Sequence, residues 1–372
     1  MDSRYFGKLS IIGMRGCEKF VDMVNYYMHQ NRPGEEDENY IVNAECIRFT
    51  SGEGKGMIHD SMRGHDVYII SDCFNYGETY KMYGKEHPMS PDDHYADLKR
   101  VIGAISGKAK RISVIMPMLY EGRQHKRKAR ESLDCAMALE ELVSMGVSNI
   151  ITFDAHDDRV QNAIPLSGFD SIRPSYQMIK AFVKNEPEIN ILDGNTMIIA
   201  PDEGALERCM YYSSVLNIDL GMFYKRRDYT VVVDGKNPIV AHEYLGNSVA
   251  GKNVIVVDDM IASGDSVFDL CKQLKAKGAS KIFVFATFGL FTAGLEKFDR
   301  FYEEGLLDRV YTTNLIYRTP ELLTREWYRE VNMSKYVYLI IDTINRDDST
   351  SNLLNPVDRI HKLMDRVKTE RK

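Results

Sequence analysis

Residues 254–267 read VIVVDDMIASGDSV, and this stretch decides which fold the chain can adopt. A β-branched apolar run ends in two adjacent aspartates, and a turn of small residues with a helix-like segment follows. Strands buried in parallel sheets read as continuous apolar runs, and open α/β sheets bind ligands beyond the carboxyl ends of their strands. The stretch therefore predicts a buried strand, a ligand-binding turn and a helix.

Apolar runs of the same kind recur along the chain and alternate with helical patterns. We predict strands at residues 67–70, 112–117, 149–154, 196–202, 253–259, 281–289 and 336–342. Helices are predicted at 131–146 and 266–280, where apolar residues recur at helical spacing and a glycine stands near the end. This alternation predicts an α/β fold with mainly parallel sheets that are flanked by helices.

The strand–helix pattern occurs twice, which predicts two domains at residues 1–170 and 171–372. A chain of 372 residues is too long for one ordinary core and suits two. No segment rich in Pro and Ser separates the halves, so we expect close packing. Residues 74–99, rich in Tyr and turn formers, are predicted to be a polar insertion in the first domain.

The composition is typical of a soluble globular protein, with 44% hydrophobic and 27% charged residues. A net charge of −6 argues against nucleic acid or an anionic membrane as a partner. No apolar stretch reaches the roughly 18–20 residues of a membrane span, and MDSRYFGKLS lacks the features of a signal peptide. Six cysteines without a CxxC pair argue against zinc and disulfides, so we expect a cytoplasmic protein.

Three predicted strands end in acidic or acid–histidine clusters, which read TFDAH, IIAPDEGA and VIVVDDM. A single aspartate in such a place is as readily explained as the cap of the following helix. Three such endings in one chain favour a shared role. Carboxylates and histidine at strand ends can converge on a hard cation, and Mg²⁺ is commonly held by one or two carboxylates with substrate phosphates.

The turn after Asp258 and Asp259 favours an anion. Small residues at a helix N-terminus present backbone N–H groups and hydroxyls, and the helix dipole favours negative charge there. The two aspartates repel a phosphate but suit the hydroxyl groups of the same ligand. The stretch therefore predicts a sugar phosphate, with its phosphate in the turn and its diol on the acids.

The same stretch resembles the phosphoribosyl-diphosphate binding loop that type I phosphoribosyltransferases share with ribose-phosphate pyrophosphokinases. Ser263 and Ser266 stand where threonine is usual and keep both hydroxyls, whereas Asp265 stands where glycine is common. The resemblance assigns the ribose 5-phosphate to Asp258, Asp259, Ala262, Ser263, Gly264, Asp265 and Ser266.

Over nearly its whole length the chain resembles the ribose-phosphate pyrophosphokinases, which implies two phosphoribosyltransferase-like domains. The segments that carry the resemblance are FTSGEG (49–54), IMPMLYEGRQHKRKARES (115–132), TFDAH (152–156), APDEGALER (200–208), FYKRRDY (223–229) and DDSTSNLLNP (347–356). It implies ATP binding by Phe49, Ser51 and Glu53 from a neighbouring subunit and by Arg123, Gln124 and His156. It implies a pyrophosphate loop of Asp202, Glu203, Gly204 and Ala205, metal binding by His156 and Asp202, and catalysis by Lys225 and Arg227.

The resemblance implies a Mg²⁺-dependent enzyme that converts ATP and ribose 5-phosphate to phosphoribosyl diphosphate and AMP. It also implies a homo-oligomer, a hexamer, with no nucleic-acid or membrane partner. The segment 347–356 resembles the closing segment that contacts the effector phosphate in several members of the family.

Other interpretations remain open from the residues alone. RQHKRKAR, YKRR and His156 could be a solvated basic face, an exposed strand end and a structural histidine. A phosphoribosyltransferase is one rival, favoured by the residue type of Ala262. A catalytically silent regulatory paralogue is the other, favoured by the departures at Asp265 and at 170–174.

Overall fold

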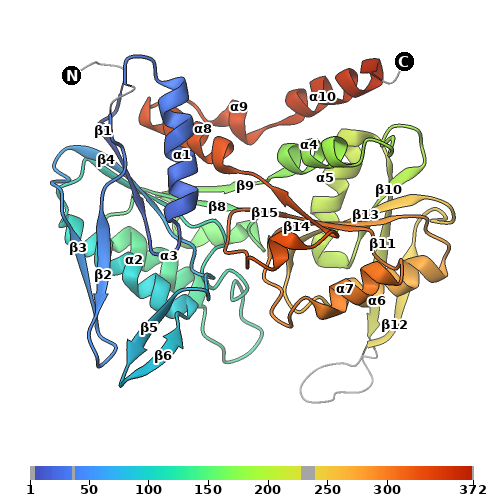
Figure 1. Ribbon diagram of the computed structural model, residues 1–372, viewed down its shortest axis with the longest axis horizontal. Coiled ribbons are helices and arrows are strands. Elements are labelled where there is room, and N and C mark those ends of the chain that lie inside the picture. The colour runs from blue at the N-terminus through green and yellow to red at the C-terminus, as the bar shows by residue number, and fades with distance from the viewer. Residues whose placement is uncertain (1–4, 36–37, 228–238, 371–372) are drawn as a thin grey trace. The chain divides into compact units, whose positions relative to one another are not determined.

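The structure is a computed structural model that describes residues 5–35, 38–227 and 239–370 (Figure 1). Its chain divides into two compact units. The first unit contains the chain up to Pro174 together with two later segments, Asn314–Thr319 and Asn332–Asn355. The second contains Ser175–Thr313, Pro320–Val331 and the C-terminal stretch from Pro356. Each unit is built on its own sheet.

The first unit contains a five-stranded parallel sheet in the order β1-β4-β7-β8-β9. Its strands are β1 (Lys8–Gly13), β4 (His65–Ile70), β7 (Arg111–Ile115), β8 (Asn149–Phe153) and β9 (Gly168–Ile172). The central strands are apolar because helices cover the sheet, as expected for parallel strands. The helices that follow the early strands are α1 (Glu18–Asn31), α2 (Pro91–Ile105), α3 (Asp134–Ser144) and the short η1 (Asp158–Ala163).

Two antiparallel hairpins extend from this unit. They are formed by β2 (Ala44–Arg48) with β3 (Gly54–Ile58), and by β5 (Thr79–Met82) with β6 (Lys85–Pro88). The second hairpin lies in the segment predicted to be a polar insertion. The end of that segment is instead the first part of α2, which begins with a capping box between Ser90 and Asp93. The buried side chains of Tyr95 and Leu98 tie this helix to the core.

The strand predicted at 336–342 is wrong, because these residues belong to the helix α8 (Ser334–Asn345). The run YVYLIID is apolar on several sides of that helix, and Val337, Ile340 and Ile341 are all buried. A short, continuous apolar run does not distinguish a buried helix from a buried strand. Helix α8 packs against α1 and is followed by the short α9 (Ser351–Leu354).

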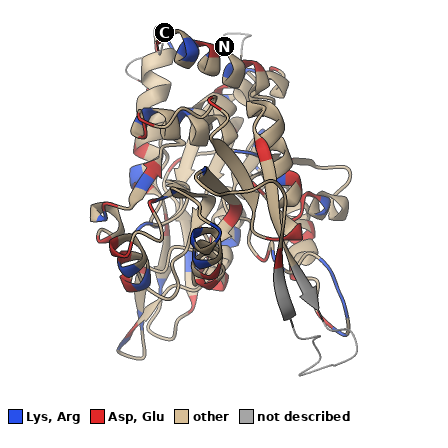
Figure 2. Ribbon diagram, turned by 90° about the vertical axis from the view of Figure 1, so that its right-hand side faces the viewer, with Lys and Arg blue, Asp and Glu red and all other residues tan. Residues whose placement is uncertain are grey.

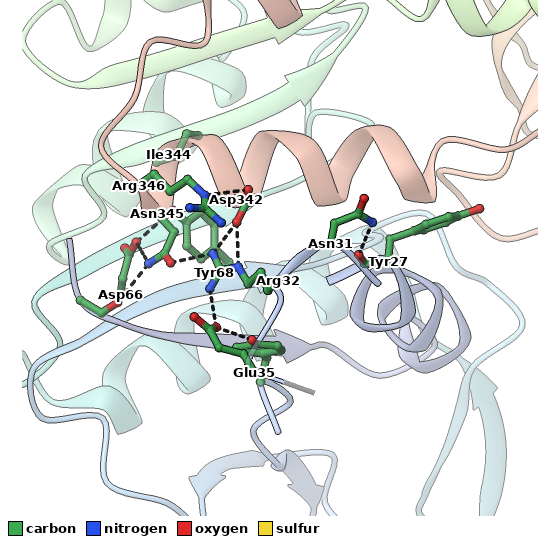
Figure 3. A network of polar contacts seen from close by, with 12 residues as sticks. Tyr27, Asn31, Arg32, Glu35, Asp66, Tyr68, Asp342, Ile344, Asn345 and Arg346 are labelled. Atoms are coloured by element: carbon green, nitrogen blue, oxygen red, sulfur yellow. Dashed lines mark hydrogen bonds and ion pairs between the residues drawn. The ribbon is translucent and has the colours of Figure 1, made fainter. Parts of the chain in front are cut away.

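A buried polar network joins α8 to the start of the chain (Figure 3). The Nε of Arg32 donates to Asp342 Oδ1 over 2.7 Å, and its Nη2 donates to Asn345 Oδ1 over 2.8 Å. Asn345 in turn donates to Asp66 on β4 over 2.9 Å, and Arg111 on β7 donates to both oxygens of that carboxylate. Because these groups are removed from water, each depends on its partners.

The second unit contains a seven-stranded sheet in the order β12-β11-β10-β13-β14-β15-β16. The strands are β10 (Thr196–Ala200), β11 (Asp219–Arg227), β12 (Ile239–Leu245), β13 (Asn253–Ile261), β14 (Ile282–Gly289), β15 (Arg309–Thr313) and β16 (Tyr328–Val331). All pairs are parallel except β11 with β12. The helices are α4 (Ser175–Asn185), η2 (Glu203–Ala205), α5 (Leu206–Leu216), α6 (Asp265–Ala276), α7 (Glu296–Glu303), η3 (Leu322–Thr324) and α10 (Val357–Glu370).

All six cysteines are free and buried in the structure. Within the part of the chain that the structure covers, no helix is both long and apolar enough to cross a membrane. Lys and Arg are interspersed with Asp and Glu over the helices and loops (Figure 2).

We expect Arg32→Ala to lower the free energy of unfolding by about 1–3 kcal/mol, because it leaves the buried amide oxygen of Asn345 and the partly buried carboxylate of Asp342 without this donor. The Arg32 side chain is only 2% exposed. Chemical denaturation checks this, with Arg366→Ala as a control because Arg366 is an exposed arginine on α10. Equal stability of the two variants would show that the network does not hold α8 in place.

Candidate functional site

Three of the predicted site segments follow neighbouring strands of the second unit. β11, β10 and β13 are adjacent in the sheet and run in the same direction, so their carboxyl ends meet at one edge. The short helix η2, which follows β10, lies against both β11 and β13. The sheet therefore brings the pyrophosphate-loop segment next to the paired aspartates and next to the end of β11.

The aspartates Asp258 and Asp259 lie inside β13 rather than at its end, which corrects the predicted limit of 259. β13 continues to Ile261 because it pairs with β14 as far as Gly289. On its other side, pairing with β10 ends at Val256, since β10 stops at Ala200. The acid pair therefore lies past the end of β10, on the side where the η2 turn begins.

The surroundings of the acid pair raise the pKa of Asp258. Asp259 is buried, and each aspartate accepts a hydrogen bond from the next backbone N–H, over 2.9 Å for Asp258 and 2.8 Å for Asp259. Burial, and then the neighbouring charge of Asp259, raise the pKa of Asp258 well above its ordinary value. Arg208, in the first turn of α5, opposes this rise in pKa through its positive charge.

Arg208 was not singled out from the sequence, although it lies within the quoted APDEGALER segment. A basic residue two positions into a helix carries no distinctive pattern. Its proximity to the acid pair depends on the pairing of β10 with β13, which the local sequence does not reveal.

The turn after β13 is shaped by Gly264. Its φ of +89° lies in the left-handed region, and a Cβ at this position would come within 2.6 Å of Phe298 Cζ. Only glycine satisfies both conditions without strain. The residue stands at the N-cap of α6, so the turn leads directly into a helix N-terminus, which favours anions.

Asp265, the residue that departs from the usual glycine, is exposed and directed to other partners. Lys297 donates to its Oδ1 over 2.8 Å, and the Ser263 hydroxyl donates to its Oδ2 over 2.9 Å. The hydrogen bond from Lys297 is the main reason why the pKa of Asp265 is lowered. Its negative charge is therefore balanced by a lysine beside the turn, which sequence patterns did not identify.

Asp202 caps η2, since its Oδ1 accepts a hydrogen bond from Gly204 N over 3.0 Å. Glu203 and Gly204 are exposed, whereas Ala205 is buried against the sheet. The capping role, which the sequence left as an alternative, is thus observed for Asp202. It occupies one carboxylate oxygen and does not exclude a ligand on the other.

The predicted catalytic residues, Lys225 and Arg227, lie at the end of β11. The structure describes their backbone but not their side chains, and residues 228–238 that follow lie outside the described residues. In the backbone pairing of β11 with β12, Lys225 lies opposite His242. This places both positions at the same sheet edge as the acid pair.

In the first unit, the segments after β7 and β8 lie beside each other because these strands are adjacent. Arg123 and Gln124 are exposed, as is His156. The ring of His125, which was not predicted, lies 5.2 Å from the ring of His156. Burial lowers the pKa of His125, so its ring favours the neutral form.

The remaining predicted ATP-binding residues form the turn between β2 and β3. Phe49 N donates to Glu53 O over 2.8 Å, and the Ser51 hydroxyl donates to Glu53 Oε2 over 2.8 Å. The ring of Phe49 is 52% exposed. The turn is therefore ordered while its aromatic ring stays open to solvent.

The described residues contain no group of three or more His, Cys, Asp and Glu side chains arranged to hold a metal ion. The two predicted ligands, His156 and Asp202, belong to different units. Carboxylates are nevertheless the ligands that Mg²⁺ prefers, and it is usually held by one or two of them with substrate phosphates. The carboxylates at the sheet edge of the second unit fit such an ion, bound together with a phosphate ligand.

Comparison with known proteins gives one consistent result. Residues 9–146 match the N-terminal domain of ribose phosphate pyrophosphokinase, and residues 170–302 match the phosphoribosyl transferase domain. A ribose-phosphate pyrophosphokinase of Pasteurella multocida is 26% identical over 316 residues, which cover 84% of this chain and 90% of that protein. Another, of Vibrio cholerae, is 25% identical over 328 residues, covering 86% of this chain and 94% of that protein.

Among solved structures, phosphoribosylpyrophosphate synthetase from Mycobacterium smegmatis has a similar fold. The TM-score is 0.73 at 21% sequence identity, over 91% of this chain and 99% of that chain. The likeness therefore extends over both units and not over one domain alone.

Gly264→Ala is expected to lower the free energy of unfolding by about 1–3 kcal/mol, because it forces a side chain into left-handed backbone. The overlap with Phe298 adds to the loss of stability. Gly103→Ala is the control, since a Cβ there, in helix α2, meets nothing within 4 Å. Thermal or chemical denaturation measures both, and unchanged stability of Gly264→Ala would contradict the assigned shape of the turn.

Proposed function

Because the chain belongs to the ribose-phosphate pyrophosphokinase family, we propose that it transfers the pyrophosphoryl group of ATP to the 1-hydroxyl of ribose 5-phosphate. The products are phosphoribosyl diphosphate and AMP, and the reaction depends on Mg²⁺. The observation that carries this proposal is the shared sheet edge of β11, β10 and β13. It puts an acid pair, a helix N-terminus and a capped turn within one site of the second unit.

In this site the acid pair orients the sugar. Asp258 and Asp259 accept hydrogen bonds from the 2- and 3-hydroxyls, which fixes the ring with its 1-hydroxyl directed toward the η2 turn. The hydroxyl of Ser266 and the N-terminus of α6 bind the 5-phosphate, and the Ser263 hydroxyl joins them by exchanging its hydrogen bond to Asp265 for one to the phosphate. Lys297 keeps the charge of Asp265 away from that phosphate. Positioning of this kind is the main requirement of phosphoryl-type transfer.

Lys225 and Arg227 neutralise the charge that develops on the transferred group. An arginine suits bidentate contact with phosphate oxygens, and a lysine acts as a mobile point charge. Mg²⁺ would be held by Asp202 at this sheet edge together with the phosphates of the nucleotide, whose charge it would neutralise. The turn of Glu203, Gly204 and Ala205 supplies backbone groups beside it.

The first unit provides the nucleotide site in this proposal. Arg123 and Gln124 bind ATP together with His156, and the β2–β3 turn of Phe49, Ser51 and Glu53 holds the adenine of a neighbouring subunit. The protein would accordingly act as a homo-oligomer, a hexamer, in the cytoplasm. The net charge of −6 argues against nucleic acid or an anionic membrane as a partner.

The decisive experiment measures AMP formation from ATP and ribose 5-phosphate with Mg²⁺ and no nucleobase. We expect turnover with the wild-type chain, because the assay then contains both substrates and the metal ion of the proposed reaction. A requirement for a nucleobase would instead indicate a phosphoribosyltransferase. No AMP under any condition, with intact binding of both substrates, would indicate a silent paralogue.

Lys225→Ala is the matched variant in that assay. We expect it to reduce kcat by about two to three orders of magnitude, as loss of one group that stabilises transition-state charge does, with little change in ribose 5-phosphate affinity. Near-normal turnover would remove Lys225 from the mechanism.

The raised pKa of Asp258 predicts a pH dependence of sugar binding. Since a raised pKa means that the carboxyl takes up a proton at higher pH than usual, acidification removes the charge that binds the diol. The KM for ribose 5-phosphate should rise as the pH is lowered, whereas the KM for ATP should change much less.

Asp258→Asn provides the control for this pH dependence. The variant should have a higher KM for the sugar phosphate, and that KM should vary little with pH because the amide does not titrate. A pH profile like that of the wild type would assign the dependence to another group.

A further inference from the structure

The insertion hairpin β5–β6 lies beside the β2–β3 turn, and both belong to the first unit (Figure 1). Tyr83 N, at the tip of β5–β6, donates to Thr50 O over 2.8 Å. Met82 packs on Gly52, since a Cβ on that glycine would lie 2.6 Å from the Met82 sulfur. The two hairpins are thus joined at their tips.

Arg48, the last residue of β2 before the turn, also contacts both hairpins. Its side chain is buried, donates to Gly52 O over 3.1 Å within the turn, and pairs with Asp97 on α2 over 2.9 Å. Its guanidinium lies 4.8 Å from the ring centre of Tyr80 on β5. Tyr80 also donates through its hydroxyl to Asp93 on α2. The arginine that fixes the turn is therefore covered by the insertion.

The tip of β5–β6 has an unusual backbone. Tyr83 and Gly84 have φ values of +49° and +76°, the pattern of a two-residue hairpin turn that asparagine or glycine adopts more readily than tyrosine. Strained backbone at an exposed position is a reason to look for a role. Here the strained residue carries the N–H that holds Thr50, and its own ring is 79% exposed.

We propose that the β5–β6 hairpin is a positioning element, which holds the β2–β3 turn in the conformation that binds the nucleobase of ATP. This rests on the function proposed above, in which Phe49, Ser51 and Glu53 bind the adenine. Tyr80 acts by covering Arg48, which holds the Gly52 carbonyl, and Tyr83 acts by its hydrogen bond to Thr50. Neither tyrosine needs to contact ATP.

The hairpin can be removed with little disturbance to the scaffold. Met89 N donates to Glu78 O over 2.8 Å, so the two ends of the hairpin already adjoin. A variant in which residues 79–88 are replaced by two glycines therefore keeps the start of α2 in place. We expect its KM for ATP to rise about tenfold or more, with kcat at saturating ATP and the KM for ribose 5-phosphate within about twofold of wild type.

Point variants make the same test without excision. Tyr80→Ala removes the ring above Arg48 and is expected to raise the KM for ATP by about fivefold, whereas Tyr80→Phe keeps the ring and should restore most of the affinity. Tyr26→Ala, in an exposed tyrosine of α1 in the same unit, is the control and should behave as wild type. Circular dichroism and sedimentation of each variant check that fold and assembly are retained.

The possible outcomes separate this inference from the proposed function. If the wild type forms no AMP, the proposed function fails. If the wild type is active while Tyr80→Ala and the excision variant keep a normal KM for ATP, only the positioning role is overturned. Loss of assembly in these variants would likewise overturn it, as would an equal fall of kcat/KM for ATP and for ribose 5-phosphate. Either result would make the hairpin a general structural support.

Discussion

The parallel pairing of β10 with β13 is the constraint from which the candidate site follows. Its register stops at Val256, so the next residues of β13 have no strand on that side. Asp258 and Asp259 lie in this part of β13. Their charges repel each other, and burial of Asp258 makes its charged form less favourable. Such an arrangement is costly for stability unless a ligand or a nearby cation shares the charge. Arg208 supplies part of that compensation, and hydroxyl groups of a sugar suit the rest.

The same edge explains why the site is assembled from short segments far apart in sequence. Parallel strands direct all their carboxyl ends one way, so loops of only a few residues meet there. Asp202 reaches the site through its capped turn, and Gly264 lets the chain reverse into α6. The rigid sheet fixes where each loop begins, and the loops provide the chemistry.

Much of this was predictable from local pattern. The strands at 67–70, 149–154 and 281–289 were recognised because they are buried and β-branched, and helix 266–280 because its apolar spacing is regular. The acid pair and the glycine turn are recognisable because two adjacent aspartates follow an apolar run and are themselves followed by a turn of small residues. What local pattern could not supply was the interaction between segments that are apart in the chain, such as the effect of the Arg208 charge on the pKa of Asp258.

The strand prediction at 336–342 was wrong for the same reason, because it depended on a contact between distant segments. Tyr336 to Ile341 are apolar on several sides because the helix is buried against α1 within the first unit, and this partner is more than three hundred residues away in the chain. Similarly, the residues of the β5–β6 hairpin look like an ordinary polar loop. Their relation to the β2–β3 turn depends on Arg48 and Thr50, which no spacing rule connects to Tyr80 or Tyr83.

The return of residues 332–355 to the first unit also bears on how the protein is made. Asn345 completes the hydrogen bonds of Asp66, a residue 279 positions earlier. During synthesis the strands of the first unit emerge early, yet helix α8 follows only after residues 175–313 of the second unit have been translated. The usual order, in which an N-terminal domain folds to completion while the rest is still being synthesised, is therefore closed to this chain. Until then the first unit lacks the helix that packs against α1 and the side chain that completes the hydrogen bonds of Asp66.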